Sequence, residues 1–148
     1  MAEKKTTKQI QEELMTSMKQ WQKIEDKSVE SCGRVIESTD NPLIKLVMEI
    51  IQNDSKMHYR VQGMIMKSLE EPIPLTPDDM TEVWEGLEKH LALEKQMVGH
   101  VEQTLNDVKK RKMMIPEYLL NYLYTDEIKH NSLLSLLEGI KKGMYPYG

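Results

Sequence analysis

Residues 119–134 read LLNYLYTDEIKHNSLL, and this stretch sets the period on which the interpretation of the whole chain depends. Apolar residues recur in it at intervals of three and four, which predicts the buried stripe of a long amphipathic helix. Glu127 and His130 fall on the same stripe, three residues apart, near its middle. The full stripe is Leu120, Leu123, Glu127, His130, Leu134 and Leu137.

Prolines divide the rest of the chain into segments of similar length. Pro42 follows Asn41 and Pro77 follows Thr76, while Pro116 opens the segment that contains the quoted stretch. Proline is favoured in the first turn of a helix, and Asn and Thr are good N-cap residues. These signals predict a short C-terminal tail and four long helices, at about 7–38, 42–69, 77–111 and 116–142.

The composition supports the same class. The chain has 148 residues, of which 39 % are hydrophobic, and only 7 glycines and 6 prolines. A sandwich of short strands needs a turn every eight to twelve residues, and this chain has too few turn-forming residues for that. We therefore expect an all-α protein, a single four-helix-bundle domain that spans residues 1–148.

Charge and cysteine content exclude several classes of partner and site. Lys and Arg number 20 against 24 Asp and Glu, so the net charge is −4, and we expect no binding to nucleic acid. Neither a secretory leader nor a membrane span of about 18 apolar residues is recognisable, so we expect a cytoplasmic protein. Cys32 is the single cysteine, which rules out an intramolecular disulfide and a cysteine-based zinc site.

Each of the four predicted core stripes is interrupted by polar residues near mid-helix. An ionised carboxylate in the core of a bundle is unfavourable unless it is paired or bound to a metal ion. In an antiparallel hairpin, mid-helix positions meet at one level, so these acids and histidines would converge and need a cation or protons. The interruptions are Glu25, Ser55 with His58, Glu94, and Glu127 with His130.

The two halves of the chain repeat one another. Residues 24–29 (IEDKSV) echo 93–98 (LEKQMV), and residues 51–58 (IQNDSKMH) echo 123–130 (LYTDEIKH). The repeat predicts two equivalent helical hairpins, each carrying a Glu on one helix and a His on the next. Two alternatives remain open: a register error that places some of the acids in water, and a hydrogen-bonded polar layer that sets the register of the bundle.

Over roughly residues 10–140, this ordered set resembles the ferritin-like superfamily, and most closely its rubrerythrin-type branch. That family holds two metal ions with one Glu on helices one and three and Glu-x-x-His on helices two and four. The resemblance implies that Glu25 and Glu94 are terminal carboxylate ligands and that Glu127 is a bridging carboxylate. It makes His58 and His130 the imidazole ligands.

Ser55 departs from the family pattern, because it stands where the family has its second bridging Glu. A hydroxyl is neutral and a poor ligand for iron(II) or manganese(II). We therefore expect an asymmetric site centred on Glu94, Glu127 and His130. It would hold one or two ions per chain (iron, with manganese or zinc as alternatives), or none if the site has decayed.

Two functions follow from these expectations. By resemblance, the chain is an iron-dependent oxidoreductase or peroxidase that reacts with peroxide or dioxygen. Because it lacks a Cys-x-x-Cys pair, it would take electrons from an external donor. The alternative is a non-catalytic bundle that has lost its metal and serves as a dimerisation or partner-binding module. In either case we expect a homo-oligomer, a dimer.

The connection between the second and third helices is a further departure. A lengthwise crossover, as in the ferritins, needs about 13 extended residues, more than residues 70–76 supply. Three solutions are open: an early end of the second helix near Gly63, an up-down-up-down order, or exchange of hairpins between two chains. Among the remaining residues, we expect Trp21 and Trp84 to pack in the core. We expect His90, four residues before Glu94, to be a partly exposed flank residue, with a hydrogen bond to Glu94 as the alternative.

Overall fold

The computed structural model describes residues 3–144, and all its regular elements in that range are α-helices. They are α1 (Thr7–Ser38), α2 (Pro42–Glu70), α3 (Pro77–Lys109) and α4 (Met114–Met144). The all-α class and the four helices are therefore confirmed, and the helices begin and end within two residues of the predicted ranges. The predicted tail lies outside the described residues, apart from Met144 at the end of α4.

Local capping explains where three of the helices begin. The Thr6 side chain accepts from Gln9 N, and Gln9 reciprocates at the Thr6 backbone, which makes a capping box at the start of α1. Asn41 accepts from the backbone N–H groups of the first turn of α2. Thr76 and Asp79 form a second capping box at α3. The cap residues are local in sequence, so these starts were predictable.

The turn between α3 and α4 differs slightly from the prediction. Helix α3 ends at Lys109, because Arg111 N donates to the carbonyl of Val108 and Lys112 adopts a left-handed conformation with φ of 54°. Helix α4 then begins at Met114, ahead of Pro116. Met113 acts as its cap, since its carbonyl accepts from Glu117 N. Pro116 still falls in the first turn, where no N–H donor is needed.

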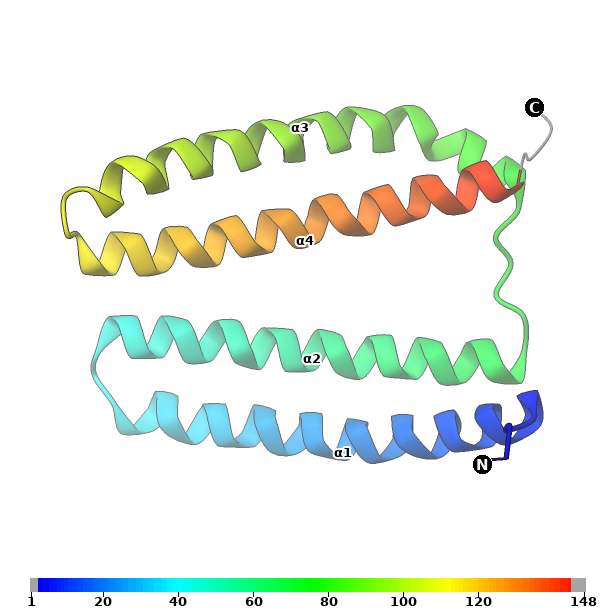
Figure 1. The fold of residues 1–148 in the computed structure, drawn as a ribbon. Helices are drawn as coiled ribbons and strands as arrows, with labels where there is room; N and C mark the ends of the chain where they lie inside the picture. The colour runs from blue at the N-terminus through cyan, green and yellow to red at the C-terminus, as the bar shows by residue number, and fades with distance from the viewer. Residues whose placement is uncertain (1–2, 145–148) are drawn as a thin grey trace. The chain divides into compact units, whose positions relative to one another are not determined.

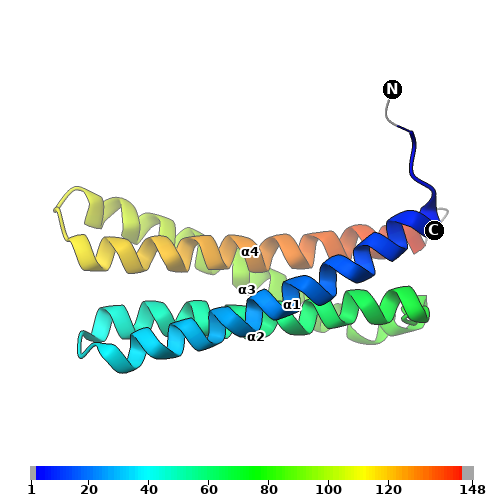
Figure 2. The ribbon, with the colours of Figure 1, turned by 90° about the horizontal axis from the view of Figure 1, so that it is seen from below.

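The helices pair as two antiparallel hairpins, which form two compact units divided after Pro74. Within the first hairpin α1 lies along α2, and within the second α3 lies along α4, as both views show (Figure 1, Figure 2). Helix α2 continues to Glu70, so the predicted alternative in which it ends near Gly63 is wrong. None of the helices in the described range is long and apolar enough to cross a membrane.

Each hairpin buries a narrow stripe between its two helices. The buried residues of the first hairpin are Met18, Cys32, Ser55 and Gln62. Those of the second are Met80, Glu94, Val101 and Leu105. Polar residues therefore occupy half of the most buried positions of the first hairpin, and Glu94 occupies one in the second.

Part of the predicted core stripe is not covered within its hairpin. Trp21 remains 49 % exposed and Ile51 43 % exposed, so the first hairpin by itself does not cover them, and the packing of Trp21 in a bundle core stays a prediction. A helix that contacts one neighbour buries only one side of a broad apolar stripe. Trp84 is half-buried, with Lys141 Nζ 3.9 Å above the centroid of its ring and its Nε1 donating to Glu88.

Candidate metal centre

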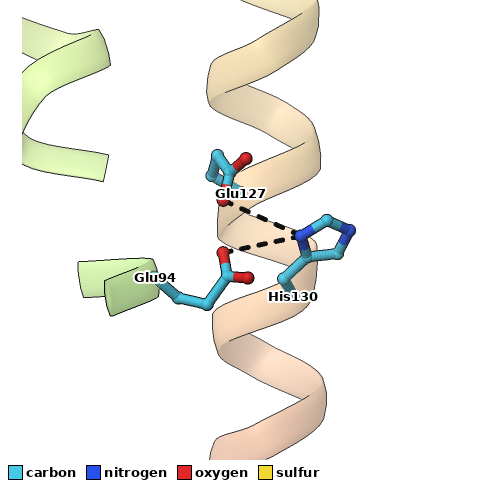
Figure 3. Close-up of side chains that lie close together, drawn as sticks. All are labelled: Glu94, Glu127 and His130. Atoms are coloured by element: carbon cyan, nitrogen blue, oxygen red, sulfur yellow. Dashed lines mark ion pairs between the residues drawn. The ribbon is translucent and has the colours of Figure 1, made fainter. Parts of the chain in front are cut away.

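Glu94, Glu127 and His130 come together at mid-height of the second hairpin. Glu94 projects from α3 toward α4, and Glu127 and His130 extend from successive turns of α4 to meet it (Figure 3). One ligand atom from each residue lies within 4.8 Å of the others. His130 Nδ1 is 3.5 Å from Glu94 Oε2 and 3.7 Å from Glu127 Oε2.

Helix geometry explains this convergence. Residues three apart lie on one face of a helix, so Glu127 and His130 point the same way. Glu94 lies at the matching level because α3 and α4 run antiparallel from a turn of only a few residues. The exposed fractions of the three side chains are 10 % for Glu94, 17 % for Glu127 and 38 % for His130. The register therefore directs both carboxylates inward and leaves the imidazole partly accessible.

Glu94 is a buried acid with an incomplete set of partners. Its Oε1 lies 2.9 Å from His90 Nε2 on the preceding turn. Its Oε2 is buried and has no hydrogen-bond donor among the described residues when the carboxylates are ionised. Buried polar atoms are nearly always satisfied by a hydrogen bond, water or an ion. The orphaned oxygen faces His130 Nδ1, which is where a cation would bind.

The two carboxylates shift one another's pKa in opposite directions. A hydrogen bond from Glu127 lowers the pKa of Glu94, with help from His130 and His90, although burial opposes the shift. The same hydrogen bond raises the pKa of Glu127, and burial and the negative charge of Glu94 add to the rise. The opposite shifts therefore favour Glu127, and not Glu94, as the carboxyl that carries a proton when no cation is bound.

An acid on the same helix contacts the far side of the imidazole. His130 Nε2 lies 3.3 Å from Asp126 Oδ2, and Asp126 is itself paired with Lys129 Nζ at 2.7 Å. With a cation bound at Nδ1, the carboxylate of Asp126 would hold the proton of the imidazole on Nε2. Asp126 is thus placed to support the tautomer that a metal ligand needs.

The first hairpin arranges its counterpart residues differently. Glu25 Oε1 lies 3.5 Å from His58 Nδ1 and accepts a hydrogen bond from Gln62 Nε2 at 3.2 Å. The hydroxyl of buried Ser55 is 2.8 Å from that of half-buried Ser28, so these two hydroxyls satisfy one another. Within the described residues, no third acid, cysteine or histidine joins Glu25 and His58. These contacts match the hydrogen-bonded polar layer that the sequence left open as an alternative.

His90 is partly exposed, as predicted, and also makes the contact with Glu94 that was left open as the alternative. Its side chain is 58 % exposed, and its Nε2 lies 2.9 Å from Glu94 Oε1. Gln62 and Asp126 were not singled out, although Gln62 falls on the predicted stripe one turn after His58. Its position four residues beyond the histidine was the available signal, since residues four apart share a helix face.

The donor set of the second hairpin fits a divalent metal ion. Ligand atoms around one ion at about 2.1 Å lie about 3.0–3.5 Å apart, close to the two distances from His130 Nδ1. Two carboxylates and a neutral imidazole balance a charge of +2, and the orphaned Oε2 of Glu94 gains a partner. Glu94, Glu127 and His130 can therefore hold a metal ion.

Comparison with protein-family models, with curated proteins and with solved structures finds no match to this chain.

Proposed function

We propose that the second hairpin binds one divalent transition-metal ion through Glu94, Glu127 and His130, and that this ion is iron. On this proposal the chain is a ferritin-like metal-carboxylate protein of the rubrerythrin type that reacts with peroxide or dioxygen. The observation that carries it is the convergence of Glu94, Glu127 and His130, whose ligand atoms lie within 4.8 Å of one another, with His130 Nδ1 3.5 Å from the buried Oε2 of Glu94.

The chemistry of the ligands favours iron or manganese among the divalent metals. Carboxylate oxygens suit hard ions, and a single imidazole is common at non-haem iron. Bound iron would supply one-electron redox chemistry and coordination positions open to an oxidant. The protein donors number only three, which leaves such positions free.

The surrounding residues have separate tasks in this proposal. Glu127 would release its shared proton when the ion binds, because both carboxylates are then needed as anions. Asp126 orients the imidazole of His130, and His90 engages Oε1 of Glu94 so that Oε2 is directed at the ion. The partly exposed face of His130 gives small oxidants access to the site. Electrons would come from an external donor.

Metal analysis tests the first part of the proposal. The chain is equilibrated anaerobically with iron(II), manganese(II), cobalt(II) or zinc(II), and bound metal per chain is measured after dialysis. We expect one ion per chain, and none in Glu94→Gln or Glu127→Gln. Glu102→Gln, an exposed acid on α3, is the matched control and should still bind one. A wild-type chain that binds no metal would contradict the proposal.

Peroxide consumption tests the second part. Iron-loaded chain supplied with a chemical reductant should consume peroxide at a rate that depends on both Glu127 and His130. A chain that binds metal but does not consume peroxide would support metal binding and contradict the proposed oxidoreductase activity. The satisfied polar layer of the first hairpin favours the second candidate, a metal-free interaction module, and that candidate would gain support from a chain that binds no metal at all.

A further inference from the structure

The two hairpins differ at two positions that flank the same histidine. In the second, Glu127 and Leu134 lie three residues before and four residues after His130. In the first, Ser55 and Gln62 hold the corresponding positions around His58. Ser55 in the position of Glu127 removes a carboxylate ligand. Gln62 in the position of Leu134 adds a hydrogen-bond donor. We propose that the Gln62 amide takes the place of a cation beside Glu25 and so confines metal binding to the second hairpin.

The contacts of Gln62 support this role. An ionised carboxylate only accepts hydrogen bonds, so the Nε2–H group of Gln62 must face Glu25, 3.2 Å away. Gln62 is 8 % exposed, and its own Oε1 is buried without a donor among the described residues. A buried amide that leaves its oxygen unsatisfied in order to donate to a carboxylate is acting as a counter-group to that carboxylate.

Other polar groups of the first hairpin are engaged too. Oε1 of Glu25 lies near both Gln62 Nε2 and His58 Nδ1, so an ion bound through this oxygen would compete with both contacts. Ser55 is engaged with Ser28. An ion would have to displace these contacts and would gain only two ligands, whereas in the second hairpin it gains three and satisfies the orphaned oxygen of Glu94. This asymmetry depends on the proposed function of the second hairpin.

One isosteric substitution tests the inference. Gln62→Glu keeps the shape of the side chain but replaces the donor with a carboxylate beside Glu25 and one turn from His58. A groove of about 410 Å³, lined in part by Glu25, Ser55 and Tyr59, opens beside the carboxylate of Glu25. We expect cobalt(II) bound per chain to rise from one in the wild type to two in Gln62→Glu.

The matched control is Gln52→Glu, which makes the same change on the same helix. Gln52 Nε2 donates to the backbone carbonyl of Val29 at 3.0 Å and contacts no acid through that bond. This control should stay at one ion. A folded Gln62→Glu chain that also stays at one ion would overturn the inference.

Two further variants keep the test independent of folding and of the proposed function. Gln62→Glu combined with Glu127→Gln should bind one ion through the first hairpin alone, even if the wild type binds none. Gln62→His adds a neutral ligand one turn from His58 and should also add an ion, without placing two acids together. If Gln62→Glu requires metal to fold, recovery of helical circular dichroism on adding cobalt(II) supports the inference. Failure of both Gln62 substitutions to add an ion contradicts it.

Discussion

Glu127→Gln is expected to have opposite effects on the metal-free and metal-bound protein. Glu127 and Glu94 place carboxylate oxygens within 4.8 Å of one another. Two unit charges at that distance repel by about 3.5 kcal/mol at an effective dielectric constant of 20. The proton that Glu127 retains and the nearby His130 remove a large part of this repulsion. We therefore expect Gln at this position, which can still donate toward Glu94, to stabilise the metal-free chain by about 1–2 kcal/mol.

Bound metal is expected to make the wild type more stable than Glu127→Gln. The wild type at a free metal concentration of about 100 times its Kd gains about 2.7 kcal/mol, because the ion binds the folded chain only. Glu127→Gln loses one of three ligands and one charge, so it should gain almost nothing under the same conditions. A stabilisation of 1 kcal/mol corresponds to about 3 °C in Tm for a chain of this size.

Thermal unfolding with and without cobalt(II), followed by circular dichroism at 222 nm, measures both effects. We expect the Tm of Glu127→Gln to exceed that of the wild type by about 3–6 °C without metal and to fall below it with metal. Glu102→Gln should follow the wild type in both conditions. A Glu127→Gln chain that is less stable than the wild type without metal would refute the reasoning about the shared proton. One that metal stabilises as much as it does the wild type would refute the assignment of Glu127 as a ligand.

Three further outcomes are expected. The pKa of Glu127 is raised, so the stability that its proton provides is present in acid and is lost as pH rises through that pKa. The Tm advantage of metal-free Glu127→Gln should therefore widen as pH rises from 5 to 8, and a constant gap would contradict the shift. Asp126→Asn should weaken cobalt(II) binding by about tenfold to a hundredfold in an absorbance titration, because His130 loses the carboxylate that orients it; unchanged affinity would remove that role. Met18→Ala should destabilise the chain by about 2–5 kcal/mol in urea denaturation, since Met18 is 1 % exposed, whereas Met57→Ala, at a site 51 % exposed, should change stability by less than about 0.5 kcal/mol.

The helices were predictable because their signals are local. Asn41 with Pro42 and Thr76 with Pro77 define two starts from adjacent residues, through hydrogen bonds that no other part of the chain can change. The end of α3 was less accurate, because the conformation of Lys112 depends on how the turn closes and not on a strong sequence signal.

The convergence of Glu94, Glu127 and His130 was predictable for a similar reason. Heptad spacing determines which face of a helix a residue shares, and a short turn determines which levels meet across a hairpin. The partners of these residues were harder to predict. The contact between His90 and Glu94 depends on a side-chain rotamer, and spacing alone does not distinguish a solvated histidine from one that reaches a buried acid.

The first hairpin shows where periodicity alone is insufficient. The pattern groups Glu25 and His58 correctly, since they lie 3.5 Å apart. It does not reveal that Gln62 donates to Glu25, because a polar residue on a core stripe is equally compatible with several partners. Nor does it reveal that Trp21 stays 49 % exposed within its hairpin, because the stripe on α1 is wider than one neighbouring helix can bury.

The most direct test of the account is to identify the nitrogen ligand of the bound ion. The chain is labelled with ¹⁵N at histidine, loaded with manganese(II) and examined by pulsed electron paramagnetic resonance. We predict coupling to one directly bound imidazole nitrogen, which persists in His58→Ala and disappears in His130→Ala. A nitrogen coupling that survives in His130→Ala, or bound manganese with no coupled imidazole, would contradict the assignment of the metal to the second hairpin.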